Sequence, residues 1–471
     1  MGSKYEFCSL GDLADFSSGG TPSKKVTAYW NGNIPWISAK TLNKDDIYTS
    51  NLFITQEGLE AGSKIADAGS LLILTRGSGL FKDIPIGYVA APVAFNQDIK
   101  AISVADEDQI SSRFLFYALK SCKSRISEMV ETTGIGAGKL STDRLLSMKL
   151  PIPNKEIQQK ILSIVRPIDN RISLNNQIND YLAESILCIW RKHTDQSSNQ
   201  ITIDEAAKEI ITGKTPPTKH ADFYGYDYPF ITIPDMHDSV WLTSTERGLS
   251  ETGNNSQPKK LVKRGTVLVS CIATLGLVGI VSKPSHFNQQ INAVVPKRAS
   301  EGYFLYPALL SIKQALLGIG ATGSATLNVN KGAFSNIKIP WLQSDDMDAY
   351  IYAVQPLFEA IEVNSKECLI LNSLRDTMLS KLLSGEIDVS KTNIDKLNNH
   401  LAKVPLNCII ETIHHESQFF ASGQFQQRFS RSKANLPHCR HDTLNFLAIC
   451  RQAYACCVCF VAFQALVVSF Q

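Results

Sequence analysis

Gly19-Gly20-Thr21-Pro22 recurs 194 residues later as Gly213-Lys214-Thr215-Pro216, and the alignment continues without a gap. Pro35-Trp36-Ile37-Ser38 then matches Pro229-Phe230-Ile231-Thr232. Further matches in the same order are Gly69–Ile73 with Gly265–Val269, Phe95–Ile99 with Phe287–Ile291, and Met148–Pro151 with Ile337–Pro340. The offset stays between 196 and 189. A period this far above the roughly 20–50 residues of a solenoid unit indicates a duplicated domain.

Each copy begins with a segment whose pattern favours β-structure, over residues 1–152 and 197–340. Short apolar runs separated by Gly, Pro and Asn are typical of strands. The apolar spacing turns helical once in each segment, which predicts a helix there. The predicted strands include Leu71–Leu74, Ile86–Ala90, Val267–Ser270 and Leu277–Val281, and the predicted helices are Ser111–Val130 and Glu301–Leu317.

Each copy ends in a helical segment, over residues 153–196 and 341–390, with side chains spaced alternately by four and three. This spacing is the seam of a coiled coil. One seam cannot be buried alone, so we expect the two helices to pack on each other. The first seam is Ile161, Val165, Ile168, Ile172, Asn175, Asn179, Leu182, Ile186 and Ile189. The second, degraded toward its C-terminal end, is Tyr350, Val354, Leu357, Ile361, Asn364, Cys368, Leu371, Arg375 and Met378.

Two features of the seam recur in both copies. Pro167 and Pro356 each precede a seam position. A proline inside a helix removes a hydrogen bond, so each segment is expected to be a short helix followed by a longer one. Asn175 and Asn364 occupy one seam site, where an asparagine either fixes register and partner at a cost in stability or simply faces water. The longer helix, from Pro167 to Lys192, would be about 39 Å long, close to one turn of B-DNA.

The composition is that of an ordinary globular chain. The 471 residues carry 47 basic and 44 acidic side chains, a formal net charge of +3, and 44% hydrophobic residues. These values exclude a disordered or collagen-like chain. They give no sign of a protein that coats DNA, which would normally be strongly basic. Five of the eleven cysteines are scattered before residue 390, which fits buried thiols in a reducing cytoplasm.

The two β-rich segments, each opening with Gly-x-Thr-Pro and Pro-aromatic-Ile and each ending in a Pro-capped helix, resemble the specificity subunit of a type I restriction–modification system. The last helix closes with Leu382-Leu383-Ser384-Gly385-Glu386-Ile387, so the resemblance covers residues 5 to about 390. Each motif alone is weak evidence for this family. The same motifs in the same order in both copies, at one spacing, are strong evidence. The resemblance implies an α+β fold, with two target-recognition domains in pseudo-twofold arrangement joined by two long antiparallel helices that act as coiled-coil spacers.

The resemblance also implies a function. Each recognition domain would read one half of a split, asymmetric site in double-stranded DNA, and the spacers would set the distance between the halves. The chain would have no catalytic activity and no cofactor or metal of its own. It would dock two methyltransferase subunits, which make N6-methyladenine from S-adenosylmethionine, and through them the restriction/translocase subunits. ATP and Mg²⁺ would likewise belong to partner subunits, and no membrane is implied.

Candidate DNA contacts follow from residue chemistry. Phosphate contacts position a protein, whereas contacts to base edges specify sequence. The Gly-x-Thr-Pro loop allows close backbone approach to a ligand, although it suits an ordinary tight turn equally well. For any single lysine the alternative is a solvated surface charge. The candidates are Gly20, Thr21, Lys24, Lys25, Lys40, Arg76 and Lys139 in the first domain and Lys214, Thr215, Lys219, Lys259, Lys260, Lys263 and Lys331 in the second.

Some candidate residues differ between the two copies, and others are the same in both. Arg76 could reach guanine with both arms of its guanidinium, and its counterpart is Ile272, so this contact would serve one half-site only. Asn96-Gln97 and Asn288-Gln289 could pair with adenine. Because both copies keep them, a shared structural role is favoured. Residues that differ between the copies are expected to carry the specificity.

Two motifs resemble those of enzymes. Residues 133–140 resemble a phosphate-binding loop, but Thr133 stands where Gly is required and Leu140 where Ser or Thr is required. Asn33-Ile34-Pro35-Trp36 resembles the Asn-Pro-Pro-aromatic site of adenine methyltransferases but lacks the first Pro. Trp36, like Phe230, is interpreted as a core residue. A self-contained adenine-specific DNA methyltransferase and a scaffold without DNA contact are the alternative functions.

Residues 391–471 lie outside the repeat and outside the family pattern. They hold six of the eleven cysteines, at spacings unlike those of a closed zinc site. The stretch from Ala453 to Phe470 is apolar but marginal for a membrane span. We interpret this Cys-rich tail as poorly ordered or non-native, and we favour a non-native extension such as a frameshift or read-through product. Its deletion is expected to leave DNA recognition and assembly intact.

Overall fold

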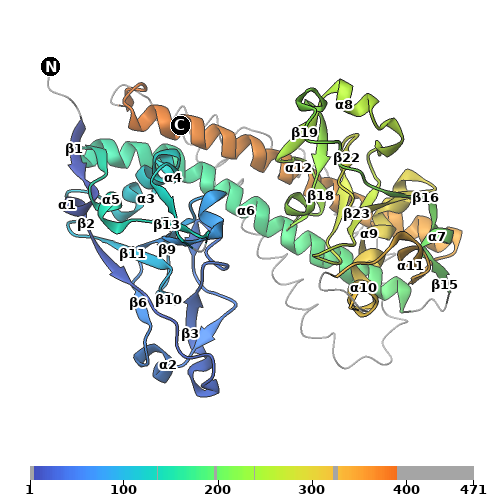
Figure 1. The fold of residues 1–471 in the computed structure, drawn as a ribbon, viewed down its shortest axis with the longest axis horizontal. Helices are drawn as coiled ribbons and strands as arrows, with labels where there is room; N and C mark the ends of the chain where they lie inside the picture. The colour runs from blue at the N-terminus through green and yellow to red at the C-terminus, as the bar shows by residue number, and fades with distance from the viewer. Residues whose placement is uncertain (1–4, 135, 196–198, 238, 322–326, 390–471) are drawn as a thin grey trace, which may run out of the picture. The chain divides into compact units, whose positions relative to one another are not determined.

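The computed structural model describes residues 5–134, 136–195, 199–237, 239–321 and 327–389. Within them the fold consists of two β-rich domains and two long helices (Figure 1). Helix α6 (Lys155–Thr194) follows the first domain and helix α12 (Ser344–Leu383) the second. The predicted α+β fold with two spacer helices is confirmed. The predicted tail lies outside the described residues.

The two domains share one strand order, which confirms the duplication. In each, a five-stranded sheet is ordered β2-β11-β7-β9-β4 or β16-β23-β20-β21-β18. All neighbours are antiparallel except the last pair, which is parallel in both domains. The first sheet comprises β2 (Ala14–Ser18), β11 (Ile99–Val104), β7 (Leu71–Leu74), β9 (Ile86–Val89) and β4 (Asp46–Ile47). The second comprises β16 (Ala207–Thr212), β23 (Ile291–Pro296), β20 (Val267–Ser270), β21 (Val278–Val281) and β18 (Trp241–Leu242).

Smaller sheets extend each domain. The first domain has the orders β5-β3-β10-β6, β12-β13-β8 and β1-β14, and the second has β19-β17-β22 and β15-β24. Their bounds in the first domain are β5 (Phe53–Ile54), β3 (Trp30–Ile37), β10 (Val93–Phe95), β6 (Lys64–Ala66), β12 (Val130–Thr132), β13 (Gly138–Leu140), β8 (Arg76–Gly77), β1 (Tyr5–Ser9) and β14 (Lys149–Pro153). In the second they are β19 (Arg247–Leu249), β17 (Tyr224–Ile231), β22 (His286–Phe287), β15 (Gln200–Thr202) and β24 (Lys338–Pro340).

Each predicted domain helix is in fact two helices. α3 (Ser112–Ser121) and α4 (Lys123–Ser127) meet at Cys122, and α9 (Gly302–Ser311) and α10 (Lys313–Gly320) meet at Ile312, with the same backbone break in both copies. Apolar periodicity continues across such a break, so the sequence pattern does not reveal it. The remaining short helices are α1 (Leu10–Leu13), α2 (Gln56–Glu60), α5 (Thr142–Leu146), α7 (Ile203–Ala206), α8 (Glu251–Asn255) and α11 (Lys331–Ser335).

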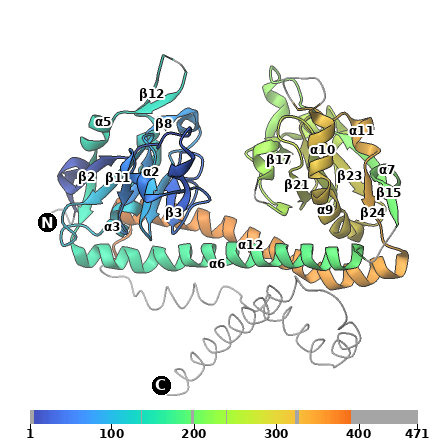
Figure 2. The same ribbon diagram turned by 90° about the horizontal axis from the view of Figure 1, so that it is seen from below.

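Helices α6 and α12 lie side by side and run antiparallel along one side of both domains (Figure 2). Each domain core takes part of both helices. The first core includes Ile161 and Val165 of α6 together with Leu379 and Leu382 of α12. The second includes Ile186 and Trp190 of α6 together with Tyr350, Val354 and Phe358 of α12. The predicted seam therefore packs against the domains near its ends and against the partner helix near its middle.

The expected helix breaks at the two prolines are wrong. α6 and α12 are each continuous over 40 residues, with Pro167 and Pro356 inside them. A proline there forfeits one backbone hydrogen bond. Buried neighbours on both sides, such as Val165 and Ile168 in α6, keep the helix seated on the protein and offset that loss.

The middle of the helix pair is polar. Cys368 Sγ donates to the Ile172 carbonyl at 3.8 Å, and Asn364 Nδ2 donates to Asn179 Oδ1 at 2.9 Å. These contacts place Asn175 and Asn364 at the centre of the crossing, and both side chains are fully buried. The alternative that they face water is therefore excluded. Asn175 Nδ2 donates to Glu367 at 2.7 Å, so the seam asparagines hold cross-helix hydrogen bonds of the kind that fixes register.

Arg375, where the second seam loses its apolar character, lies buried between the helices and the first domain. It pairs with Asp169 of α6 at 2.9 Å, with Asp45 at 3.5 Å and with Asp376. Tyr117 donates to the other oxygen of Asp169 at 2.5 Å. Burial and the Asp169 charge together raise the pKa of the Tyr117 hydroxyl, which therefore stays a donor. This network joins both helices to the first domain.

His286 is a buried residue of the second domain without a titratable counterpart in the first, where Ala94 takes its place. Its Nε2 lies 3.0 Å from Asn254 Oδ1, and its Nδ1 lies 3.4 Å from Gln257 Nε2. A neutral ring that donates from Nε2 and accepts at Nδ1 satisfies both contacts. Burial lowers the pKa of His286 to about 4.

We expect the second domain to lose stability as the pH falls from 6.5 toward 4. The unfolded chain binds a proton on this histidine below pH ~6.5 and the folded one does not, which amounts to about 2 kcal/mol between pH 7 and pH 5. Denaturant unfolding of the wild type and of His286→Gln across that range measures the effect. The substitution should flatten the pH dependence, and an unchanged slope would show that other groups cause it.

Candidate nucleic-acid interface

The Gly-x-Thr-Pro loop is tied to strand β10 in the first domain. Gly20 N donates to the Phe95 carbonyl at 2.9 Å, and Thr21 Oγ1 donates to Gln97 Oε1 at 2.5 Å. The second domain repeats both bonds between Lys214 and Phe287 (3.0 Å) and between Thr215 and Gln289 (2.5 Å). The hydroxyls of Thr21 and Thr215 are thus used inside the fold, and these contacts support the interpretation of the loop as a tight turn.

The shared asparagines also have structural partners. Asn96 Nδ2 donates to Asp98 Oδ2 at 3.1 Å, and Asn96 Oδ1 accepts from the Asp98 backbone at 3.2 Å. Asn288 makes the same two bonds with Gln290. Trp36 and Phe230 are buried, as predicted. Residues common to both copies therefore build the framework of each domain.

Arg76 and Lys139, 63 residues apart in the sequence, are brought together by the structure. They face each other across the antiparallel strands β8 and β13, and both side chains are exposed. In the second domain the same two positions form the isolated bridge between Ile272 and Asn328. A basic pair in one domain is thus replaced by an apolar and an amide side chain in the other.

The segment that resembles a phosphate-binding loop is a β-hairpin. Thr133 N donates to the Ala137 carbonyl at 2.8 Å, which closes the turn between β12 and β13. Lys139 lies within β13 rather than at a helix start, so the strand–loop–helix context that phosphate binding requires is missing. The hairpin projects away from α6 and α12 (Figure 2). Ile135 lies outside the described residues.

The predicted lysine contacts fall in several places. All are exposed except Lys260, whose ammonium donates to the Thr212 carbonyl at 2.8 Å and is thus committed to the fold. Gln257 Nε2 donates to the Lys214 carbonyl at 3.2 Å, so the segment 257–260 lies beside the Gly-x-Thr-Pro loop. The structure therefore brings Lys214 and Lys259 to one region. The other exposed lysine candidates are Lys24, Lys25, Lys40, Lys219, Lys263 and Lys331.

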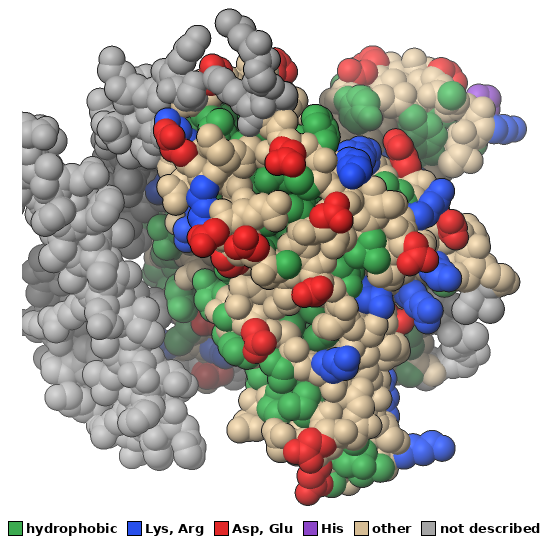
Figure 3. Space-filling view, turned by 90° about the vertical axis from the view of Figure 1, so that its left-hand side faces the viewer, with side chains coloured by type: hydrophobic (Ala, Val, Ile, Leu, Met, Phe, Trp, Pro, Cys, Tyr) green, Lys and Arg blue, Asp and Glu red, His purple; other side chains and the backbone are tan. Residues whose placement is uncertain are grey.

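The end face of the first domain carries intermixed charges and no extended basic patch (Figure 3). Several of the basic side chains in this domain are paired. Arg113 lies 2.6 Å from Asp46, and Lys120 lies 2.6 Å from Asp45. Such pairs leave the exposed Arg76 and Lys139 as stronger candidates for contact with an external anion or base.

Across residues 5–389, apart from the short gaps in the description, no three His, Cys, Asp or Glu side chains gather closely enough to bind a metal ion. None of the helices described there has the length and apolarity needed to cross a bilayer.

The spacer helices expose apolar side chains on the surface that points away from the seam. Leu174 and Tyr181 of α6 are exposed, and so are Val363 and Ile370 of α12. At the repeat offset of 189, Leu174 corresponds to Val363 and Tyr181 to Ile370. We call these two pairs the outer stripes. The sequence analysis did not single out these residues. They form a second series with a spacing of seven, and only the seam series was assigned a role.

A family model described as the type I restriction modification DNA specificity domain matches residues 2–184 and 201–342. The chain is 33% identical over 326 residues to the type I restriction enzyme HindI specificity subunit of Haemophilus influenzae, covering 53% of this chain and 71% of the relative. It is 26% identical over 414 residues to the MjaIX specificity subunit of Methanocaldococcus jannaschii, covering 81% and 93%. A crystal structure of the S subunit of a type I system from M. genitalium is 16% identical, with 80% and 96% covered and a TM-score of 0.47.

Proposed function

Because the chain belongs to the type I restriction modification DNA specificity family, we propose that each β-rich domain reads one half of a bipartite, asymmetric site in double-stranded DNA. One observation carries this proposal. The two domains repeat their framework bonds but differ at exposed positions, as Arg76 and Lys139 differ from Ile272 and Asn328. Two domains that share one framework but carry different contact residues suit two half-sites of different sequence.

The spacer helices would fix the distance between the half-sites. A helix of 40 residues spans about 60 Å, which exceeds the roughly 34 Å of one DNA turn. Both helices contribute to both domain cores. Neither domain can then move along the pair without breaking apolar contacts, so the gap between half-sites would be a fixed property of the chain.

The outer stripes support docking of two methyltransferase subunits. Apolar side chains left exposed in clusters mark interaction surfaces. Because the stripe on α6 repeats on α12, two copies of one partner could bind in equivalent ways. The restriction/translocase subunits would join through them.

The chemistry would belong to those partners. Trp36, the aromatic residue of the motif that resembles an adenine methyltransferase site, is buried and donates from Nε1 to the Gly20 carbonyl at 3.1 Å. It is therefore not available to a substrate base. We propose that the chain is non-catalytic, that S-adenosylmethionine, ATP and Mg²⁺ act in partner subunits, and that the complex works on DNA in the cytoplasm.

The test is to co-express the chain with its methyltransferase subunit and to map N6-methyladenine by single-molecule sequencing. We expect an asymmetric motif of two separated parts. Exchanging the basic pair for its counterpart, Arg76→Ile with Lys139→Asn, should weaken binding to the original site about 10- to 100-fold and relax one half-site only. Methylation of one continuous short site would contradict the proposal, and tight binding of S-adenosylmethionine by the isolated chain would favour a self-contained methyltransferase.

A further inference from the structure

A bulge in strand β17 displays an aromatic side chain of the second domain. Leu249 of β19 faces both Tyr224 and Tyr228, so the three residues between them, Gly225 to Asp227, loop out of the ladder. Tyr226, at the centre of this bulge, is 95% exposed. A bulge re-aims side chains that would otherwise lie in the sheet, and here it holds a phenol ring in solvent.

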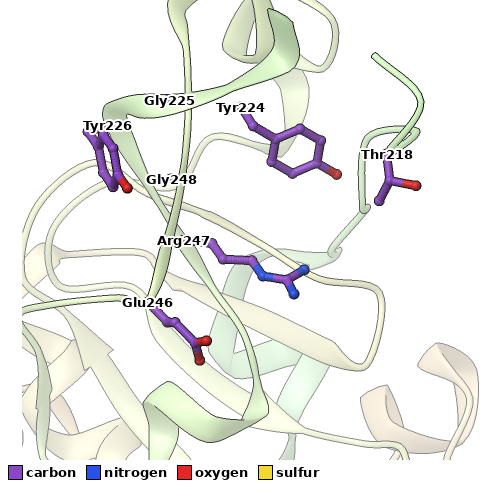
Figure 4. A pocket seen from close by; sticks show the side chains of 7 residues that line it. All are labelled: Thr218, Tyr224, Gly225, Tyr226, Glu246, Arg247 and Gly248. Carbon is purple, nitrogen blue, oxygen red and sulfur yellow. The ribbon is translucent and has the colours of Figure 1, made fainter. Parts of the chain in front are cut away.

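Tyr226 borders a hollow of about 450 Å³ (Figure 4). Tyr224 forms part of its wall, with its hydroxyl donating to the Pro216 carbonyl at 2.7 Å. The Arg247 side chain extends into the hollow between Tyr224 and Glu246. Arg247 is exposed, and among the described residues its guanidinium has no ion pair. An unpaired guanidinium beside an exposed aromatic ring is equipped to bind a ligand.

The first domain repeats the bulge but not its chemistry. Ile54 of β5 faces both Trp30 and Ile34, so residues 31–33 loop out of β3 in the same way. By strand register, Gly32 corresponds to Tyr226, and Leu52 corresponds to Arg247. The platform is therefore common to both domains, whereas the residues it presents differ. This is the pattern expected of residues that determine specificity.

We propose that this hollow is a base-reading site of the second domain, in which Arg247 binds the guanine of a G·C pair and Tyr226 packs against a neighbouring nucleotide. This inference rests on the proposed DNA-reading function. A guanidinium fork matches guanine O6 and N7 in the major groove, and a carboxylate accepts from the cytosine N4 amino group. Arg247 and Glu246 together thus match the two bases of one pair.

Glu246 favours a base over a phosphate as the ligand, because its charge repels an anion that approaches Arg247. Its carboxylate lies 3.7 Å from the Lys82 ammonium, with both side chains exposed. Exposed pairs of this kind contribute little and exchange readily, so Glu246 can turn to a base amino group.

The experiment uses the full chain co-expressed with its methyltransferase subunit, with methylation motifs mapped and DNA binding measured at two salt concentrations. Arg247→Leu and Tyr226→Gly install the residues of the first domain, and Arg247→Lys keeps the charge but loses the fork. Lys208→Ala removes an exposed charge elsewhere in the second domain and serves as the control. We expect Arg247→Leu and Arg247→Lys to weaken binding to the wild-type site about 10- to 100-fold and to relax one G·C position of one half-site.

Two results would overturn the base-reading site while leaving the proposed function intact. One is an unchanged motif with binding within twofold of wild type. The other is a loss of binding in Arg247→Leu that is equal for all DNA sequences, is accompanied by a weaker salt dependence, and is restored in Arg247→Lys. This outcome would indicate a phosphate contact. By contrast, absence of a bipartite motif for the wild-type complex would reject the proposed function itself.

Discussion

Replacing Arg375 with methionine should lower the free energy of unfolding by about 3–5 kcal/mol. Arg375 is buried, and its loss leaves Asp169 as a nearly buried carboxylate without its main partner. Removing one member of a buried ion pair costs far more than replacing both members. Chemical denaturation of the purified chain, followed by circular dichroism, measures the change.

Two variants separate this effect from a general loss of charge. Asp376 is the exposed partner of Arg375, so Asp376→Ala should cost less than about 1 kcal/mol, as is usual for exposed ion pairs. Combining Arg375→Met with Asp169→Leu should recover much of the loss. The second domain already has an apolar pair at the corresponding positions. Ile186 corresponds to Arg375, and Phe358 corresponds to Asp169. A loss below about 1 kcal/mol for Arg375→Met would contradict the prediction.

Gly213→Ala should destabilise the second domain by about 3 kcal/mol or more, because no space exists for an added methyl group. A Cβ at Gly213 would lie 2.1 Å from the Asn288 carbonyl oxygen and 2.5 Å from that of Phe287. Both obstacles are backbone atoms at the end of β22 and just beyond it, where the Gly-x-Thr-Pro loop rests, so relief requires this backbone or the loop to shift. Thermal unfolding and the methylation motif of the complex both report the outcome.

The control is Gly318→Ala in helix α10 of the same domain, where nothing lies within 4 Å of the added carbon. That substitution should stabilise by about 0.5–1 kcal/mol through helix propensity. Gly19→Ala meets the Phe95 carbonyl at 2.1 Å and should damage the first domain in the same way. Equal stabilities of Gly213→Ala and wild type would show that the loop packs less closely than described.

The fold was predictable because the sequence repeats the same pattern of strands and helices in two copies. Strands β7 and β20 coincide with the predicted ranges, and the repeat order alone implied two domains and two helices. The division of each seam between helix partner and domain core was not predictable, since apolar spacing shows that a face is buried but not what covers it. The continuity of α6 through Pro167 also depends on tertiary contacts that offset a local loss.

The sequence predicted which residue types could contact DNA, but not which of these residues lie next to one another in the fold. Arg76 and Lys139 were separate candidates, and only the strand register makes them neighbours. Lys260 looked like a free charge, yet its ammonium is bound to the Thr212 carbonyl. Tyr226 was not among the predicted contact residues, because its exposure arises from the bulge opposite Leu249, which the sequence does not reveal.

The sharing of the helices between the domains has a consequence for synthesis of the chain. The first domain emerges from the ribosome early, but its core is completed by Leu379, Leu382 and Leu383, which are translated some 230 residues after strand β14 ends. Until then an apolar surface stays uncovered. A chain truncated before this last turn keeps the residues of the second core, of which Ile361 is the last, but leaves the first core incomplete, and cellular proteases can recognise the exposed surface. Completion of the first core thus depends on translation through the final turn of α12.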